Sequence, residues 1–522
     1  MQQLKRLDLL MVLAATLIGI AGCNNNHNNT DESTTRGSLT QNPPTQVAQF
    51  SATDFTSTLN SSTDGQSLLA LAGTPQCGID IRHIEYVTVG AKGESITDTG
   101  ALMVPNGSSS SCTGARPIVL YAHGTTVEKS YNIANIVDPN NAGYSESLLM
   151  AALFAAQGYI VVAPNYAGYD TSTLSYHPYL NADQQSKDMI DALSAARSAL
   201  EGLSASGSSD DGRLFIAGYS QGGLVAMATQ RALQELGQTV TAAAHMSGPY
   251  ALEAMGDAVL TGSVNLGSTF FIPLLANGYQ NSYGNVYTEV TDFYSNSFSS
   301  GISNLLPSSY SNEELIINGL LPQTALFSST TPSTGDSTLD DLLAIPSSPL
   351  FALGFGDPYL INNSVRTAYA LDIASNPDGF FPTPTAEAKV ASSSAYGLRE
   401  DLRINDMRYD ETFSPASPTL LCGGHDDPTV YFFNAQAMQA FWAPYNLPDG
   451  LLTVLDLETG LGSGDPYTTL ESGFAELKTQ IAAEAVTAGA TDGGVAAVAT
   501  SYHGTLVQPF CTAAARGFFT NF

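Results

Sequence analysis

The stretch RLFIAGYSQGG, residues 213–223, decides the fold. Its first half is an apolar run that predicts a buried strand, and the segment after it has apolar residues at helical spacing. Between them, Gly218, Ser220 and Gly222 form the pattern G-x-S-x-G, in which the glycines permit a tight turn. We expect this turn to hold Ser220 in a strained conformation with its hydroxyl exposed at the end of the sheet. The alternative is a glycine-rich turn in which Ser220 only caps the helix.

Strand and helix patterns alternate on both sides of this turn. Apolar runs at 117–122, 159–164 and 239–246 predict further buried strands, and helical patterns lie at 145–158 and 186–202. Helices of this length between buried strands indicate a mostly parallel sheet with helices on both faces. Together with the G-x-S-x-G turn, this pattern predicts the α/β class and an α/β-hydrolase fold.

The alternation stops in the middle of the chain. Segments rich in Tyr, Phe, Ser and Asn replace it, mixed with short helical patterns, and we interpret them as a largely helical cap inserted into the sheet domain. The predicted organisation is a signal peptide at 1–22, a flexible Asn- and Thr-rich tether at 23–50, the first part of the core at 51–250, the cap at 251–400 and the second part of the core at 401–522.

A serine nucleophile needs a base and an acid that orients the base, and in this fold they follow in that chain order: nucleophile, acid, histidine. Of the seven histidines, only His503 follows both the serine and the acid candidates. We therefore predict that His503 is the base. The alternative is a histidine on a surface loop, because SYHG has the composition of a loop.

The acid is expected in the segment CGGHDDPTV, which follows a buried strand. Its Gly424-x-x-Asp427-x-x-Val430 spacing resembles the acid loop of this superfamily, so Asp427 is the first choice. Asp426 and Asp456 remain the alternatives, as does a turn without a catalytic part. For the oxyanion hole we predict the backbone N–H groups of Gln221 and Thr125.

The N-terminus indicates export. Two basic residues precede an apolar run of about a dozen residues that ends in Ile-Ala-Gly-Cys, which is typical of a secretory signal. This ending resembles the lipobox of bacterial lipoproteins, which implies cleavage before Cys23 and attachment of a lipid to its thiol. The alternative is an ordinary signal peptide. The predicted location is therefore the outer membrane through a lipid anchor, the cell surface or the periplasm, or else the medium.

Four cysteines remain after Cys23, and an even number in an exported chain suggests two disulfides. We favour Cys77–Cys112 and Cys422–Cys511, of which the second ties the acid segment to the histidine segment. No CxxC spacing supports a zinc site, so no metal is expected.

The composition excludes some classes of protein. With 43% hydrophobic residues a large core is possible, so the chain is not globally disordered. The formal net charge of -30 repels polyphosphates, which argues against nucleic acid as a partner.

The segments APNYAGYD, HPYLNAD, MIDALSAARSAL and GYSQGG together resemble the secretory lipase family of α/β-hydrolases. The resemblance runs from about Pro117 to Tyr250, with weaker support at GGHDDPTV and SYHG. It implies a serine hydrolase of carboxylic esters, often acylglycerols, with a cap over the site. The chain departs from the family pattern at Asn165, where many members carry Asp, and this affects a local loop contact rather than the triad.

The predicted activity is that of a carboxylic ester hydrolase that forms an acyl-enzyme on Ser220 and needs no cofactor. Its expected substrates are small acyl esters, acylglycerols or polyesters. The alternatives are a serine peptidase of the same superfamily and a catalytically inactive surface-binding lipoprotein.

Overall fold

The computed structural model describes residues 35–203, 207–462 and 464–522. The predicted signal peptide and Cys23 lie outside these residues. No helix within the described ranges is long and apolar enough to span a membrane.

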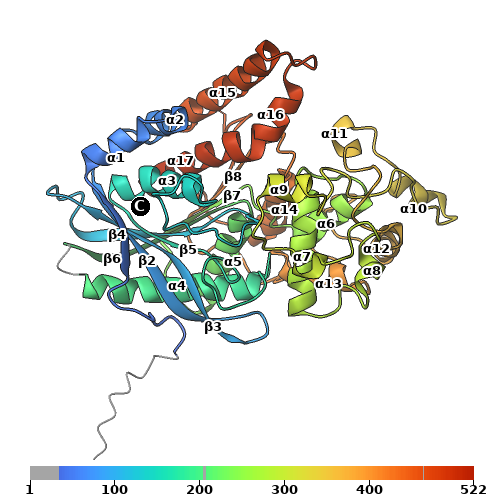
Figure 1. Ribbon diagram of the computed structural model, residues 1–522, viewed down its shortest axis with the longest axis horizontal. Helices are drawn as coiled ribbons and strands as arrows, with labels where there is room; N and C mark the ends of the chain where they lie inside the picture. The colour runs from blue at the N-terminus through green and yellow to red at the C-terminus, as the bar shows by residue number, and fades with distance from the viewer. Residues whose placement is uncertain (1–34, 204–206, 463) are drawn as a thin grey trace, which may run out of the picture.

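A single sheet forms the centre of the described structure (Figure 1). Its nine strands lie in the order β1-β2-β3-β5-β4-β6-β7-β8-β9, and every pair from β5 through β4 to β9 is parallel. The first three strands pair antiparallel, and so do β3 and β5. The strands are β1 (Thr45–Phe50), β2 (Gly78–Val89), β3 (Ser95–Asn106), β4 (Gly114–Ala122), β5 (Ile160–Pro164), β6 (Ser208–Tyr219), β7 (Ala242–Met246), β8 (Thr419–Gly423) and β9 (Leu452–Asp456). This arrangement confirms the predicted α/β-hydrolase fold.

Helices cover both faces of the sheet. In Figure 1, α4 packs below the sheet and contacts α5, whereas α3 and α17 lie above it. Every residue of β5, β7 and β8 is buried, which agrees with their mainly apolar sequences. The helices of the core are α1 (Ala52–Leu59), α2 (Thr63–Ala72), α3 (Tyr144–Leu153), α4 (Ala182–Gly202), α5 (Gln221–Glu235), α14 (Phe433–Trp442), α15 (Thr468–Thr487), α16 (Val495–Ser501) and α17 (Gln508–Phe519).

The predicted tether is partly wrong. Residues 45–50, assigned to it by the sequence, form β1 and pair antiparallel with the edge of β2. Upstream, the Gly37 N–H donates to the Val87 carbonyl, and Arg36 Nε lies 2.9 Å from an Asp191 carboxylate oxygen. The polar composition concealed this strand because an edge strand is held by backbone hydrogen bonds and needs little apolar surface.

The region between β7 and β8 is helical. It contains α6 (Leu252–Thr261), α7 (Ser268–Ser282), α8 (Val290–Phe293), α9 (Asn312–Ile317), α10 (Ser337–Leu342), α11 (Pro349–Ala352), α12 (Asn363–Ser375) and α13 (Gly397–Asn405). Its apolar side chains share one cluster with Leu224 and Met227 of α5. The cap therefore packs against the helix that follows Ser220.

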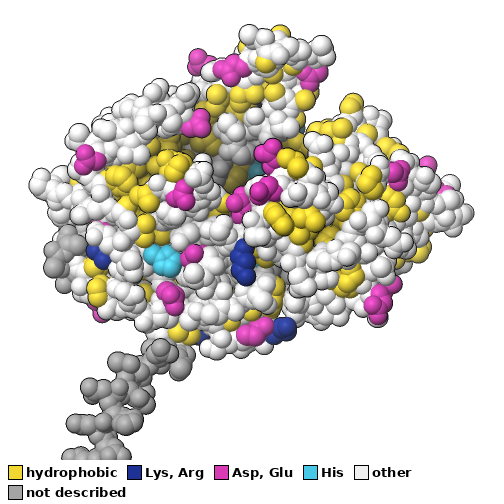
Figure 2. Space-filling model, viewed as in Figure 1, with side chains coloured by type: hydrophobic (Ala, Val, Ile, Leu, Met, Phe, Trp, Pro, Cys, Tyr) yellow, Lys and Arg dark blue, Asp and Glu magenta, His cyan; other side chains and the backbone are white. Residues whose placement is uncertain are grey.

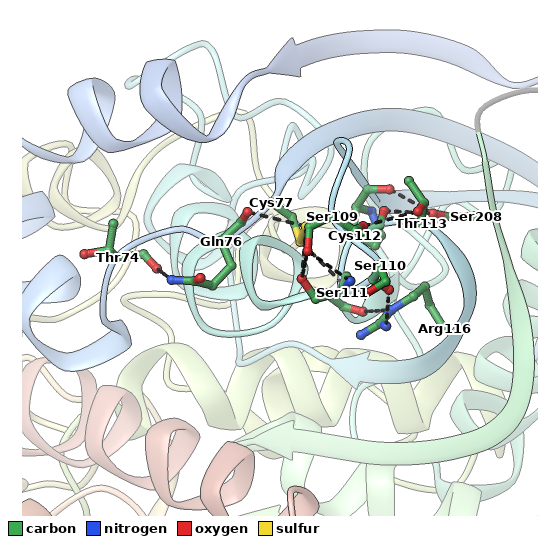
Figure 3. The surroundings of a disulfide bond; sticks show 12 residues. Thr74, Gln76, Cys77, Ser109, Ser110, Ser111, Cys112, Thr113, Arg116 and Ser208 are labelled. Atoms are coloured by element: carbon green, nitrogen blue, oxygen red, sulfur yellow. Dashed lines mark hydrogen bonds between the residues drawn. A yellow bond between two sulfur atoms is a disulfide. The ribbon is translucent and has the colours of Figure 1, made fainter.

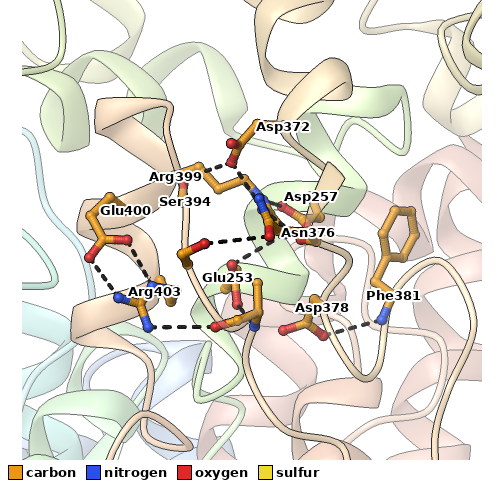
Figure 4. A network of polar contacts seen from close by, with 12 residues as sticks. Glu253, Asp257, Asp372, Asn376, Asp378, Phe381, Ser394, Arg399, Glu400 and Arg403 are labelled. Carbon is orange, nitrogen blue, oxygen red and sulfur yellow. Dashed lines mark hydrogen bonds and ion pairs between the residues drawn. The ribbon is translucent and has the colours of Figure 1, made fainter. Parts of the chain in front are cut away.

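Buried ion pairs hold the cap helices together (Figure 4). Arg399 on α13 contacts Glu253 and Asp257 of α6 at 3.2 and 2.8 Å and Asp372 of α12 at 3.0 Å. Because Asp257 and the guanidinium are fully buried, each of these two charges depends on its partner for solvation. Burial raises the pKa of the Glu253 carboxyl to about 9.

Both favoured disulfides are present. Cys77–Cys112 joins the start of β2 to the turn between β3 and β4 (Figure 3). Cys422–Cys511 joins β8 to α17. On the face shown in Figure 2, Asp and Glu outnumber Lys and Arg, as the totals of 48 and 18 in the sequence lead one to expect.

Candidate active site

Ser220 lies in a sharp turn between β6 and α5. Its backbone is at φ 56° and ψ -122°, a region that a residue with a side chain rarely adopts. A Cβ atom at Gly218 would lie 2.0 Å from the Gly222 carbonyl oxygen, and one at Gly222 would lie 1.9 Å from the Ala122 carbonyl oxygen. Both positions therefore exclude any side chain, as the G-x-S-x-G pattern predicts.

The structure brings Ser220, His503 and Asp427 together. The His503 Nδ1 atom lies 2.7 Å from Asp427 Oδ2, and Nε2 lies 2.8 Å from Ser220 Oγ. A carboxylate only accepts, so Nδ1 donates to Asp427 and Nε2 is left to accept from the serine hydroxyl. The three residues come from the turn after β6, the loop after β8 and the segment before α17.

Asp427 is fixed by hydrogen bonds from several directions. Its Oδ1 accepts from the backbone N–H groups of Thr429 and Val430 at 2.9 and 3.1 Å. The Ser247 hydroxyl donates to Oδ2 at 2.8 Å. The carboxylate is fully buried, so its orientation depends on these donors and on His503.

The two alternative acids point elsewhere. The Asp426 side chain is 64% exposed and lies 3.4 Å from Lys478 Nζ. Asp456 lies 3.3 Å from His425 Nδ1 and accepts from the His425 backbone N–H. Of the three candidates, Asp427 is the one hydrogen-bonded to His503 in the described structure.

His503 lies in a π-helical segment, Tyr502–Val507, between α16 and α17, rather than in the predicted loop. Tyr502, Leu506 and Val507 are buried there, so packing stabilises a helical path through a sequence whose glycine suggests a loop. The Tyr219 hydroxyl donates to the His503 carbonyl, and the two rings lie 4.9 Å apart.

The predicted oxyanion donors lie on the segments expected for them. Gln221 is the first residue of α5, where N–H groups have no partner within the helix. A Cβ atom at Gly124 would lie 3.8 Å from Ser220 Cβ, so the loop that carries Thr125 contacts the serine. Among the described residues, neither the Gln221 nor the Thr125 backbone N–H forms a hydrogen bond.

Three supporting residues were missed by the sequence analysis: His177, Ser247 and Glu146. The Gln221 side-chain amide donates to His177 Nε2 at 2.8 Å, while His177 Nδ1 lies 2.8 Å from the Ala167 carbonyl. Burial lowers the pKa of His177 to about 3, so the ring is neutral and Nε2 accepts. Ser247 is the second of these residues, and its hydroxyl donates to Asp427. Its position directly after β7 is the signal that was available, because adjacent parallel strands end at the same edge.

Glu146 on α3 also supports the site. Its carboxylate accepts from the Gly124 N–H at 3.2 Å and from the Tyr121 hydroxyl at 2.6 Å. It also accepts from the Tyr131 hydroxyl at 3.1 Å and from Gln508 Nε2 at 3.1 Å. One side chain thus joins the Thr125 loop to the helix that follows His503.

An apolar cavity opens beside Ser220. It encloses about 650 Å³ of space, part of it open to solvent. Its lining includes Ser220 and Gln221 and, from the cap helices, Leu252, Met255, Val259, Ile272, Leu275 and Leu398. Among the described residues, no charged side chain lines it. The described ranges also contain no cluster of three His, Cys, Asp or Glu side chains suited to a metal ion.

The sheet and the turn that carries Ser220 define an α/β-hydrolase. The model of the prolyl oligopeptidase family matches residues 145–254, which include Ser220. The chain is also similar to LipA, a rice cell wall degrading esterase from Xanthomonas oryzae whose crystal structure is known. The two sequences are 26% identical, the comparison covers 82% of this chain and 92% of that chain, and the TM-score is 0.61.

Two further comparisons agree with this class. A ligand-bound form of the same esterase has 26% identity, the same coverage and a TM-score of 0.60. A protein from Legionella pneumophila described as a putative hydrolase shares the fold at 19% identity, with 79% of this chain and 90% of that chain covered and a TM-score of 0.55. No curated protein matches the chain. The chain is a member of the α/β-hydrolase superfamily, and its similarity to LipA supports a serine ester hydrolase in general terms.

Proposed function

We propose that the chain hydrolyses carboxylic esters through an acyl-enzyme on Ser220. The observation that carries this proposal is the unbroken hydrogen-bonded series from Asp427 through His503 to Ser220, at 2.7 and 2.8 Å. His503 Nε2 takes the proton as Ser220 Oγ attacks the ester carbonyl, and returns it to the leaving alcohol. Water then repeats the sequence and releases the acid. Asp427 keeps the proton on Nδ1 and stabilises the imidazolium that forms.

The oxyanion that develops during each attack is stabilised by the Gln221 and Thr125 N–H groups. The α5 N-terminus adds a favourable dipole at the same place. Loss of one such donor typically costs about 3 to 4 kcal/mol of transition-state stabilisation. His177 accepts a hydrogen bond from the Gln221 side chain, and Glu146 accepts one from the Gly124 N–H next to Thr125, so each residue helps to hold one donor in place.

The acyl part of the substrate occupies the apolar cavity between Ser220 and the cap. The absence of charged side chains among its described lining residues favours a neutral aliphatic or aromatic acyl group. This agrees with the resemblance to the secretory lipase family, whose members often act on acylglycerols. Polyesters contain the same ester bond and are the second substrate class, because an exported enzyme encounters polymers outside the cell.

We infer from the N-terminal sequence that the enzyme works outside the cytoplasm, attached by a lipid on Cys23 to the outer membrane. The cell surface, the periplasm and the medium are the alternatives. Labelling of cells with radioactive palmitate, compared between the natural chain and Cys23→Ser, tests the anchor.

Peptidase activity is the second candidate, because the matched family model is that of prolyl oligopeptidases. Turnover of p-nitrophenyl esters compared with aminoacyl p-nitroanilides separates the two. Hydrolysis of the anilides alone would overturn the ester assignment. A fluorophosphonate label that disappears in Ser220→Ala would exclude the third possibility, an inactive binding protein.

A further inference from the structure

A buried tyrosine connects the segment of His503 to two loops at the end of the sheet. Tyr502 is 1% exposed, and its hydroxyl donates to the Glu458 carboxylate in the turn after β9. The same oxygen accepts from the Asp426 backbone N–H at 3.2 Å. A carboxylate only accepts, so the phenolic proton points to Glu458 and a lone pair is left for the N–H. Burial and the Glu458 carboxylate raise the pKa of the Tyr502 phenol, which therefore keeps this proton.

The hydroxyl also packs against the turn that carries Asp427. The Asp427 N–H donates to the Gly424 carbonyl at 3.2 Å and closes this turn. A Cβ atom at Gly424 would lie 2.6 Å from the Tyr502 hydroxyl oxygen, so the two are in direct contact. Asp426, whose N–H the hydroxyl binds, lies within the same turn. Tyr502 therefore contacts the backbone that positions the acid at two points.

The Tyr502 ring and its acceptor are held by neighbouring side chains. On α15, the Phe474 ring lies edge-on at 5.7 Å, and Lys478 Nζ lies 5.3 Å from the centre of the Tyr502 ring. The same ammonium lies 2.8 Å from a Glu458 carboxylate oxygen. The Glu458 backbone N–H donates to the Asp456 carboxylate at 3.0 Å. The hydroxyl and its acceptor are thus fixed in the structure without any substrate.

We refer to residues 424–430 as the acid loop. Among the described residues, two hydrogen bonds join this loop to the segment Tyr502–Val507. One is the triad bond from His503 Nδ1 to Asp427 at 2.7 Å, and the other runs from the Asp426 N–H to the Tyr502 hydroxyl. Asp427 stabilises the imidazolium that forms on His503 during the reaction, so their separation must stay short. The second bond fixes that separation through the backbone, whatever the charge on the ring.

We propose that Tyr502 is a positioning residue of the triad and that Glu458 is the acceptor that orients its hydroxyl. This rests on the ester hydrolase function proposed above and adds two residues that act on it through the acid loop. Neither residue lines the acyl cavity beside Ser220. The effect is therefore expected on the rate of acyl transfer rather than on substrate binding.

The first test separates kcat from KM on p-nitrophenyl butanoate. Tyr502→Phe keeps the ring and removes only the hydroxyl, so kcat should fall about tenfold with KM nearly unchanged. Glu458→Ala removes the acceptor and should also lower kcat, whereas Glu458→Gln keeps an acceptor oxygen and should recover most of the rate. The double variant Tyr502→Phe/Glu458→Ala should be no slower than Tyr502→Phe, because both changes break one hydrogen bond.

The second test needs no substrate. The proton on His503 Nδ1, held 2.7 Å from Asp427 across the hydrogen bond, should give a proton NMR resonance downfield of the amide signals, and Asp427→Asn assigns it by removing it. In Tyr502→Phe this resonance should move upfield or broaden by exchange with water. Tyr86→Phe is the matched control, because it takes a buried hydroxyl from another carboxylate, that of Asp188.

Tyr86 lies on β2, and three strands separate β2 from β6, so this control should leave kcat and the resonance unchanged while lowering stability. Unchanged kcat in Tyr502→Phe would overturn the proposal. So would a lower kcat with an unchanged resonance, because the hydroxyl would then not act through the acid and the base. If Tyr502→Phe does not fold, the two Glu458 variants carry the same measurements.

Failure of the proposed function gives a different result. In that case the natural chain hydrolyses no p-nitrophenyl ester and forms no fluorophosphonate label on Ser220. The downfield resonance and its change in Tyr502→Phe would still decide whether Tyr502 positions the acid and the base.

Discussion

Cys422 and Cys511 form a disulfide that joins the strand leading to Asp427 to the helix that follows His503. The acid and the base come from segments 76 residues apart, and α15 and α16 lie between them. Two links hold the ends of this long segment together: the Cys422–Cys511 disulfide and the hydrogen bond from His503 to Asp427. The acid and the base therefore stay in contact although a helical hairpin separates them in the chain.

Removal of this disulfide should therefore lower both stability and activity. The double variant Cys422→Ser/Cys511→Ser opens a loop with a separation of 89 residues, which should lower the free energy of unfolding by about 4 kcal/mol. Urea unfolding measures this, and kcat on a soluble ester should fall as well. Cys77→Ser/Cys112→Ser is the control, because it removes a disulfide remote from the triad and should lower stability while kcat is kept. Equal effects of the two double variants on kcat would contradict the coupling.

Substitution of the two neighbouring acids should give opposite results. Asp427→Asn removes the carboxylate that holds the proton on His503 Nδ1, so kcat should fall by a factor of about 10⁴ with little change in KM. Asp426→Asn alters a side chain that is 64% exposed, and kcat should stay within about twofold. Steady-state kinetics on a p-nitrophenyl ester checks both. A large loss in Asp426→Asn with an active Asp427→Asn would move the acid to the neighbouring residue.

The parts of the site that sequence analysis identified are those set by strict local rules. The glycines around Ser220 leave room for the backbone alone, and the chain order of the triad selects His503 from seven histidines. The Gly424-x-x-Asp427-x-x-Val430 spacing favoured Asp427 over Asp426, and in the structure Asp427 is the one of the two that is hydrogen-bonded to His503. Asn165, the departure from the family pattern, accepts from the Ile133 N–H and donates to the Thr99 hydroxyl, so an amide makes the local contact there.

The parts that were missed depend on distant segments. Glu146, His177 and Ser247 reach the site from α3, from the loop before α4 and from the end of β7. No spacing in the sequence relates Glu146 or His177 to Ser220, whereas Ser247 directly follows a predicted strand. The strand at 45–50 was missed because its polar residues are held by the neighbouring strand. In each case the position of the residue or strand is determined by the segment that it contacts, which is distant in the sequence, rather than by its own local sequence.

The stability of the cap should depend on pH through Glu253. Because burial raises its pKa to about 9, the folded chain keeps a proton that the unfolded chain releases above its ordinary value near 4.5. The folded state therefore binds more protons between these values, and stability falls as pH rises, by at most about 1.4 kcal/mol per pH unit. Glu253→Gln removes this dependence, so its stability should fall less steeply than that of the natural chain between pH 5 and 8.

Thermal unfolding across this pH range measures the difference between the two slopes. Glu387→Gln is the matched control, because its carboxylate is 63% exposed and should leave the slope unchanged. Equal slopes in the natural chain and Glu253→Gln would show that Glu253 is ionised next to Arg399 throughout.

Glu146 should affect the rate of the reaction more than the binding of substrate. Its carboxylate accepts hydrogen bonds from the N–H of Gly124, the residue before Thr125, and from the side chain of Gln508, the first residue of α17. It does not line the acyl cavity. Glu146→Ala should lower kcat by about 10- to 100-fold, less than the complete loss of an oxyanion donor, with KM nearly unchanged. Glu146→Gln keeps one acceptor oxygen and should retain more activity. Glu128→Ala removes a carboxylate from the same loop that accepts none of these hydrogen bonds, and it should leave kcat unchanged. If Glu146→Ala instead raises KM at constant kcat, the loop contributes to ground-state binding and Thr125 is not the second oxyanion donor.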